Sequence, residues 1–186
     1  MLGKIERLTN RMNEWRYQKP TCQIRLADLR DPQNQRGILQ LLDHYSQHPM
    51  GNGTSLEASI IDSVMQGLMA HPTTAVFLAF GPEVTEYESP LGMAICFVGF
   101  STFKARQLIN VHDLIVRDQV RGQGIGGTLL DAVIEFAKQQ RFCAVTLEVR
   151  RDNPARTLYA RKGFQALEEP LSEDCMLFGK LQLAVS

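Results

Sequence analysis

Residues 116–127 of this 186-residue chain read Val-Arg-Asp-Gln-Val-Arg-Gly-Gln-Gly-Ile-Gly-Gly. An apolar run from Leu114 to Val116 leads into this stretch, and an amphipathic pattern follows it from Thr128 to Gln140. This order predicts a strand, a glycine-rich loop and the N-terminus of a helix. Glycines let the backbone approach a bulky ligand because they carry no Cβ. The first N–H groups of a helix lack internal partners and the helix dipole favours negative charge there, so the stretch predicts a phosphate-binding site.

The spacing of the glycines distinguishes this loop from two other phosphate-binding loops. Gly122, Gly124 and Gly126 alternate, whereas a dinucleotide-binding loop has G-x-G-x-x-G and a P-loop ends in Gly-Lys-Ser/Thr. No Gly-Lys pair follows here, which argues against a nucleotide-binding enzyme of either kind. The pattern Arg121-x-x-Gly124-x-Gly126 instead resembles the pyrophosphate-binding motif of the GNAT superfamily of acyl-CoA N-acyltransferases.

A second motif strengthens this resemblance. Residues 153–164 read Asn-Pro-Ala-Arg-Thr-Leu-Tyr-Ala-Arg-Lys-Gly-Phe and are similar to the family's helix with an asparagine and a tyrosine, closed by Gly-Phe. The two motifs stand in the family's order and are separated by one predicted strand. The resemblance covers about residues 23–180. It implies an α/β (α+β) fold of GNAT type, in which a central mixed, mostly antiparallel sheet of about seven strands carries about four flanking helices, plus an extra N-terminal helix.

The composition is that of a soluble globular protein of one domain. Hydrophobic residues make up 44% and charged residues 22%, and the formal net charge is +0. We therefore expect neither nucleic acid nor a membrane as a partner. The absence of a long apolar run and of a signal-peptide core indicates a cytoplasmic protein. The cysteines lack C-x-x-C spacing and are expected to be reduced core thiols rather than zinc ligands or disulfides: Cys22, Cys96, Cys143 and Cys175.

The first twenty residues lie outside the resemblance. Apolar residues recur with helical spacing and Pro20 follows them, so residues 1–20 are expected to form a helical extension and residues 21–186 a single N-acetyltransferase domain; the apolar positions are Leu2, Ile5, Leu8, Met12 and Trp15. This helix either packs on its own domain or docks a second subunit of a homodimer. The sequence leaves both open.

The rest of the chain predicts a strand, two helices, three strands, a helix, a strand, a helix and two strands. Asp31-Pro32 is a helix N-cap followed by proline at the first helical position, and Thr54-x-x-Glu57 has the pattern of a capping box. The other expected boundaries are strands at 21–26, 73–80, 91–103, 108–116 and 143–149, helices ending near 45, 71, 140 and 161, a hairpin loop at 81–90, and two final strands around a turn at 172–174.

The resemblance implies acetyl-CoA as co-substrate, no metal, and direct transfer to an amine in a ternary complex. It implies that the backbone of Leu114, Ile115 and Val116 holds the pantetheine arm like an added strand. It also implies a pyrophosphate site formed by the loop and the first helical turn: Arg121, Gly122, Gln123, Gly124, Ile125, Gly126 and Gly127.

Tyr159 matches the family tyrosine that lies near the CoA sulfur and acts as general acid, and a phenol can donate a proton. One departure concerns the asparagine that contacts the CoA arm. In many relatives it stands seven residues before the tyrosine, whereas here Asn153 is six residues before it and Asp152 is seven. Asn153 is the candidate, with Asp152 as the alternative.

The general base is less clear, because the strand before the glycine loop contains no glutamate. His112 falls where aralkylamine N-acetyltransferases carry a catalytic histidine, and an imidazole suits proton removal near neutrality. A structural histidine is the alternative. Strict alternation places His112 and Asp113 on opposite faces of the strand, so they share a face only if the strand bulges.

Nothing in the sequence identifies the acceptor. We expect the primary amine of a small molecule. A protein or peptide N-acetyltransferase and an acetyl-CoA-binding sensor without turnover are the alternatives.

Overall fold

The computed structural model describes residues 15–19, 22–51, 53–82, 89–166 and 176–184. Its first half contains β1 (Arg16–Lys19), β2 (Cys22–Leu26), α2 (Pro32–Ser46), α3 (Ala58–Ala70), β3 (Thr74–Phe80) and β4 (Gly92–Ser101). Its second half contains β5 (Arg106–Val116), a 3₁₀ turn η1 (Asp118–Val120), α4 (Ile125–Gln139), β6 (Ala144–Arg150), α5 (Arg156–Arg161), β7 (Gln165–Ala166) and β8 (Met176–Gln182).

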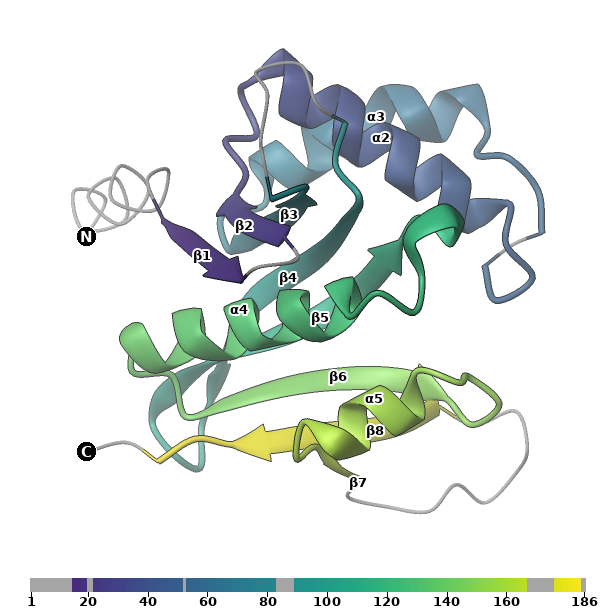
Figure 1. The fold of residues 1–186 in the computed structure, drawn as a ribbon. Coiled ribbons are helices and arrows are strands. Elements are labelled where there is room, and N and C mark those ends of the chain that lie inside the picture. Colours follow the sequence, from purple (N-terminus) through teal and green to yellow (C-terminus); the bar gives the residue numbers. More distant parts are fainter. Residues whose placement is uncertain (1–14, 20–21, 52, 83–88, 167–175, 185–186) are drawn as a thin grey trace.

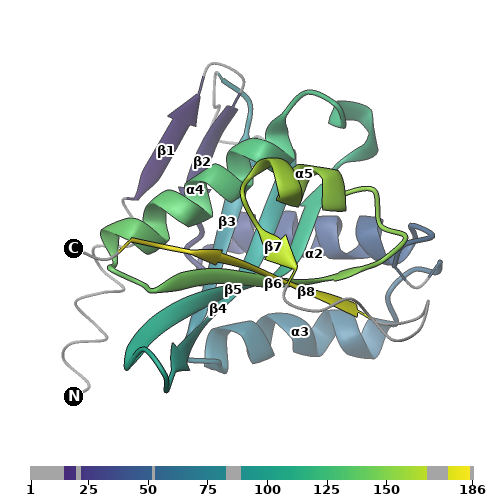
Figure 2. The same ribbon diagram turned by 90° about the horizontal axis from the view of Figure 1, so that it is seen from below.

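The strands form one eight-stranded sheet in the order β1-β2-β3-β4-β5-β6-β8-β7. Only β5 and β6 run parallel, and the other neighbouring pairs are antiparallel. Helices α4 and α5 cover one face and helices α2 and α3 cover the other (Figures 1 and 2). The predicted mixed, mostly antiparallel sheet with four flanking helices is therefore confirmed, with one strand more than expected at the N-terminal edge.

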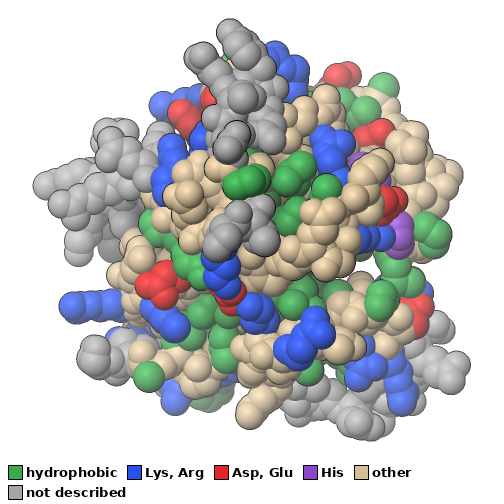
Figure 3. Space-filling view, viewed as in Figure 1, with side chains coloured by type: hydrophobic (Ala, Val, Ile, Leu, Met, Phe, Trp, Pro, Cys, Tyr) green, Lys and Arg blue, Asp and Glu red, His purple; other side chains and the backbone are tan. Residues whose placement is uncertain are grey.

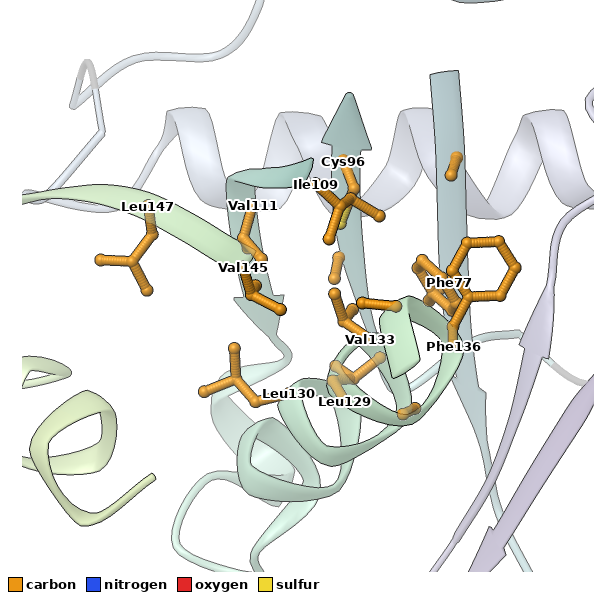
Figure 4. Packing of buried hydrophobic residues seen from close by; sticks show 14 of the residues in the cluster. Phe77, Cys96, Ile109, Val111, Leu129, Leu130, Val133, Phe136, Val145 and Leu147 are labelled. Carbon is orange, nitrogen blue, oxygen red and sulfur yellow. The ribbon is translucent and has the colours of Figure 1, made fainter. Parts of the chain in front are cut away.

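Each face of the sheet has its own hydrophobic core. Under α4, the rings of Phe77 and Phe136 meet edge to face at 5.4 Å, and the aliphatic side chains of α4 point toward those of β5 and β6 (Figure 4). Under α2 and α3, Ile38 and Leu41 pack with Met65 against the other side of the strands. Because both faces are covered at the centre of the sheet, the central strand β3 is almost entirely apolar.

The N-terminal helix prediction is wrong for Arg16–Lys19, which form strand β1 and pair with β2. The rest of that predicted helix, residues 1–14, lies outside the described residues. Trp15 packs edge to face on Phe77 and Phe136 at 5.5 and 5.7 Å, and Lys19 forms an ion pair with Asp131 of α4. A residue before proline favours extended backbone, and the edge of β2 offers hydrogen bonds to such a segment. The sheet therefore begins before the predicted domain boundary at residue 21.

The capping box predicted at Thr54-x-x-Glu57 is also wrong. Helix α3 begins after Glu57, which makes no side-chain capping bond. The preceding segment is fastened to α2 instead, because Ser46 Oγ donates to the carbonyl of Thr54 at 2.7 Å and Asp43 Oδ1 accepts from the amide of Leu56 at 3.0 Å. These tertiary bonds replace the local ones that a capping box would provide.

Two other local predictions are confirmed. Asp31 caps α2 by accepting from the amide of Gln33 at 2.8 Å, with Pro32 at the first helical position. Gly163 closes α5 with φ +86°, while the amide of Phe164 bonds the carbonyl of Tyr159 at 3.1 Å. The final two strands are present as β7 and β8, whereas most of the loop at 81–90 and the turn at 172–174 lie outside the described residues.

The surface charges and the cysteines agree with the expectations from composition. On the face shown in Figure 3, acidic and basic side chains are interspersed, in keeping with the formal net charge of +0. Cys22, Cys96 and Cys143 are buried free thiols, as predicted, and Cys175 lies outside the described residues. Among the helices of the described ranges, none combines the length and the apolarity needed to cross a membrane.

Candidate active site

The parallel strands β5 and β6 separate from each other, and this separation creates the candidate active site. They pair at three positions only: Ile109 with Val145, Asn110 with Thr146, and Val111 with Leu147. Beyond these positions β5 continues to Val116 and β6 to Arg150 without mutual pairing. A cleft of about 440 Å³ opens between the two strands and is lined from both faces of the sheet, by residues of α2 on one side and of α4 and α5 on the other.

A β-bulge in β5 places two candidate residues together. In the pairing with β4, Asp113 lies opposite Ile95 and Val111 lies opposite Cys96, so His112 is the extra residue. The bulge exchanges the faces of the strand: Val111 belongs to the core under α4, whereas Ile115 belongs to the core under α2 and α3. Because the strand bulges here, His112 and Asp113 can lie on the same face.

His112 and Asp113 form a hydrogen-bonded pair, with 3.1 Å between Nδ1 and Oδ2. The imidazole is 62% exposed, lines the cleft and meets the ring of Phe97 edge to face at 5.5 Å. When Nδ1–H donates to the carboxylate, Nε2 carries the lone pair and can accept a proton. This is the arrangement of an imidazole base oriented by an acid.

The glycine-rich loop forms the other end of the cleft and has the backbone geometry that its glycines predict. Gly122 and Gly124 have φ values of +79° and +84°, which side chains rarely adopt, and a Cβ at either position would meet no atom within 4 Å. Gly124 is the N-cap of α4 and provides no side-chain cap, and the first helical bond is donated by Thr128 at 3.0 Å. The earlier N–H groups of α4 thus have no partner within the helix, and N–H groups at such a position are suited to an anionic ligand.

Two further glycines bring helix α5 close to this loop. A Cβ at Gly126 or Gly127 would lie 3.5 or 3.6 Å from the side chain of Leu158, so α5 packs directly against the first turn of α4. Tyr159 follows Leu158 on α5 and lines the same cleft. All the predicted site residues line the cleft except Gln123: these are Tyr159, His112, Leu114, Ile115, Val116, Arg121, Gly122, Gly124, Ile125, Gly126, Gly127 and Asn153.

Tyr159 is placed so that its phenol remains protonated. Burial, followed by the nearby Tyr45, raises the pKa of Tyr159 to about 12. Its ring meets Phe164 edge to face at 6.0 Å. A phenol with a raised pKa stays a hydrogen-bond and proton donor over the neutral pH range.

The structure also shows which residue of the Asp152-Asn153 pair lies at the cleft. Asn153 lines the cleft, and its Oδ1 accepts from the amide of Ala155 at 2.9 Å in the turn before α5. Asp152 does not line the cleft and forms a bidentate pair with Arg150 at 2.8 and 3.0 Å. The one-residue departure from the family spacing therefore leaves Asn153 beside the ligand space.

Arg121 is folded across the loop. Its Nε donates to the carbonyl of Val116 at 3.2 Å, and its Nη1 lies 2.9 Å from Asp118 Oδ1 and 3.0 Å from His48 Nε2. The guanidinium therefore links the glycine loop to the turn that follows α2.

Some cleft residues were not predicted from the sequence, among them Tyr45 at the end of α2 and Glu148 of β6. His48 and Met50 also line the cleft, and they belong to the loop at 46–53, which the family resemblance offers as part of the acceptor site with a surface loop as the alternative. Glu148 accepts from Asn110 Nδ2 at 3.1 and 3.3 Å. A glutamate within a mostly apolar strand is a signal that could have identified Glu148. The end of α2 offers no comparable signal, because a tyrosine on an apolar helix face is ordinary.

Comparisons with known proteins agree with this geometry. The model of the GNAT acetyltransferase domain matches residues 93–184. An uncharacterized N-acetyltransferase of Methanocaldococcus jannaschii is 33% identical over 42% of this chain and 36% of its own length. The uncharacterized N-acetyltransferase YhfO of Bacillus subtilis is 30% identical over 40% of this chain and 51% of its own length. The chain thus spans about a third to a half of these curated relatives.

Solved structures give the same fold. The chain superposes on the NatC complex bound to Gag peptide and CoA with a TM-score of 0.65 and 21% identity, covering 87% of this chain and 98% of that one. An aminoglycoside acetyltransferase from an uncultured soil metagenomic sample, in complex with sisomicin, gives a TM-score of 0.63 and 19% identity, covering 82% and 93%. The two motifs, the separated strands and these matches together show that the chain belongs to the GNAT superfamily of acetyltransferases.

Proposed function

We propose that the protein transfers an acetyl group from acetyl-CoA directly to the primary amine of a small molecule. The observation that carries this proposal is the convergence of four features on one cleft. The cleft contains the uncapped N-terminus of α4, the unpaired edge of β5, the partly buried phenol of Tyr159 and the pair formed by His112 and Asp113. Each feature corresponds to one requirement of acetyl transfer.

The chain holds the donor through backbone groups. Acetyl-CoA supplies an activated acetyl thioester, and its pyrophosphate suits the N–H groups of the glycine loop. The edge of Leu114–Val116 that faces β6 has no strand pairing to β6, so an extended amide chain can bond there as an added strand. A backbone N–H beside Val116 is our candidate for stabilising the oxyanion.

The side chains handle protons. An alkylammonium must lose a proton before it can attack, because only the neutral amine has a lone pair. His112 Nε2 accepts that proton, and Asp113 orients the ring and stabilises its charge. Tyr159 donates a proton to the departing sulfur. Over one turnover the alkylammonium loses two protons, one before attack and one on forming the amide, while the sulfur gains one, so one proton is released to solvent.

A compact amine is our preferred acceptor. Tyr45, His48 and Met50 line the α2 side of the cleft, and its volume of about 440 Å³ is in the range of small-molecule sites. The solved relatives include one bound to a peptide and one bound to an aminoglycoside. A peptide N-terminus is therefore the second candidate.

The test combines binding and turnover. Calorimetry with acetyl-CoA and with ATP measures donor binding, and CoA release is then assayed over a panel of alkylamines, arylalkylamines, amino acids, aminoglycosides and short peptides. We expect acetyl-CoA to bind, ATP not to bind, and a small amine to give the highest kcat/KM. CoA release with peptides alone would mean that the acceptor is a peptide N-terminus and not a small amine. Acetyl-CoA binding without release for any amine would favour a sensor, and ATP binding would overturn the donor assignment.

A further inference from the structure

His48 lies between the two ends of the cleft and faces a hydrogen-bond donor from each. Arg121, at the glycine loop, brings Nη1 to 3.0 Å from His48 Nε2. The amide of Met50, in the turn after α2, lies 3.0 Å from His48 Nδ1. Both contacting groups are N–H donors, so each contact needs a lone pair on the imidazole.

A neutral imidazole has one N–H and one lone pair, so His48 accepts from Arg121 or from Met50 but not from both. The protonated ring has no lone pair and accepts from neither. The guanidinium is charged, and a charge-assisted hydrogen bond is stronger than one from a neutral amide. Without a ligand, the charged contact from Arg121 therefore favours the lone pair at Nε2 and the proton on Nδ1, in competition with the bond that the Met50 amide donates to Nδ1.

We propose that His48 is a positioning residue that couples donor binding to the acceptor side of the cleft. This inference rests on the proposed function, because it needs the pyrophosphate of CoA at the glycine loop. A pyrophosphate offers several anionic oxygens to the guanidinium, which binds such oxygens in a bidentate manner. When Arg121 turns to these oxygens, Nε2 is released and takes the ring proton through solvent. Nδ1 then has the lone pair and accepts from the amide of Met50.

The consequence reaches the acceptor wall through the backbone of Met50. Its carbonyl accepts from the hydroxyl of Tyr45 at 3.3 Å, and both residues line the cleft. Burial, followed by the charge of Asp113, raises the pKa of Tyr45, and Tyr45, His112 and Asp113 all line the cleft. Fixing both polar groups of Met50 therefore orders the wall that faces the acceptor. Donor binding prepares the acceptor site, and by linkage an ordered wall favours the donor.

The test reads the tautomer of His48 directly. Nitrogen-15 histidine spectra are recorded at about pH 8, where an imidazole is neutral, and His48→Gln identifies the His48 signals. Without CoA we expect the Nδ1–H tautomer, and with saturating CoA the Nε2–H tautomer together with slower hydrogen exchange of the Met50 amide. His71, whose Nδ1 contacts Thr73 outside the cleft, is the internal control and keeps its signals.

A second variant tests the competition without any ligand. Methionine has a length similar to arginine and no donor, so Arg121→Met frees Nε2, and we expect the Nε2–H tautomer in the absence of CoA. Saturation with CoA without a change in the His48 tautomer, or an Nδ1–H tautomer in ligand-free Arg121→Met, would overturn the inference and leave the proposed function standing. Failure of the wild-type protein to bind CoA would instead overturn the proposed function, and the inference with it.

Discussion

The two ends of the cleft are built in different ways. The donor end consists of backbone from one continuous stretch, in which β5, the loop of Gly122 and Gly124, and the first turn of α4 follow one another. The acceptor end consists of side chains from α2, the bulge of β5 and β6, which are far apart in the sequence. In the proposed function, the backbone groups bind the part that all acyl-CoA donors share, and the side chains select the amine. Changes at the donor end should therefore alter binding of CoA, and changes at the acceptor end should alter turnover.

The largest effect is expected from a charge placed in the donor loop. Gly124→Glu puts a side chain into a left-handed conformation, which costs about 1–3 kcal/mol, and points a negative charge into the pyrophosphate space. We expect acetyl-CoA affinity measured by calorimetry to fall by at least about 100-fold.

Gly53→Glu is the matched control for this variant. Gly53 also has a positive φ, +73°, with open space around it, but it does not line the cleft. It should bind acetyl-CoA as the wild-type protein does. Unchanged affinity in folded Gly124→Glu would remove the loop from the donor site.

A large effect on rate alone is expected at Tyr159, which lines the cleft from α5. Tyr159→Phe removes the proton donor and little volume, so kcat should fall by about 10²–10⁴-fold while acetyl-CoA affinity is kept. Since burial raises the pKa of Tyr159 to about 12, the phenol stays protonated as pH rises, and the defect should persist across neutral and moderately alkaline pH.

Tyr45→Phe, at the other tyrosine of the cleft, is the comparison and should lower kcat by less than about tenfold. A wild-type rate in Tyr159→Phe, measured where chemistry limits turnover, would exclude the acid role.

An intermediate effect is expected at His112 on the acceptor end. His112→Gln should lower kcat/KM by about 10–100-fold and remove the fall in rate at acidic pH, because the group that loses activity on protonation is gone. Acetyl-CoA affinity should not change. The measurement is a pH–rate profile with a melting temperature for the same variant.

His71→Gln is the matched control, since His71 also packs edge to face on Phe97, at 4.9 Å, but lies outside the cleft. It should keep the wild-type profile. A wild-type profile in stable His112→Gln would leave proton removal to water or another cleft residue. A lower melting temperature with normal turnover per folded molecule would make His112 structural.

The smallest effect on catalysis is expected in the frame that supports both ends. Asp131 of α4 bonds Lys19 of β1 and Lys162 after α5, both at 2.5 Å. Burial acts to raise the pKa of Asp131, but the two lysines outweigh it and hold the pKa below its usual range. Asp131→Asn should cost about 1–2 kcal/mol of folding stability at neutral pH, because the pair is only partly buried, without changing kcat.

The pH dependence follows from the lowered pKa. The stabilisation is present above the unfolded pKa and is lost as pH falls through the folded one, so the difference from Asp131→Asn should shrink in acid. Denaturant unfolding at neutral and acidic pH measures it, with Asp62→Asn on the exposed side of α3 as the control. Equal losses in both variants would mean that the bonds to the lysines contribute nothing.

The sequence by itself determined the donor end and most of the elements. The alternating glycines, the Asp31-Pro32 cap and the Gly163 closure act within a few residues, so their backbone geometry follows from local composition. The sequence also placed His112 on the strand before the loop, because that strand runs directly into the glycine motif. Its role as the base remains a prediction.

Only the tertiary structure decided the acceptor end. The bulge at His112 depends on the register of β5 with β4. Strand β1 forms because its backbone pairs with the edge of β2 and because the preceding Trp15 packs on Phe77 and Phe136. The segment at Thr54 is hydrogen-bonded to Ser46 of α2 and does not cap α3, because this bond between distant residues replaces the local capping bond. Contacts between residues far apart in the chain carry no local pattern, and the contact between His48 and Arg121 is of this kind.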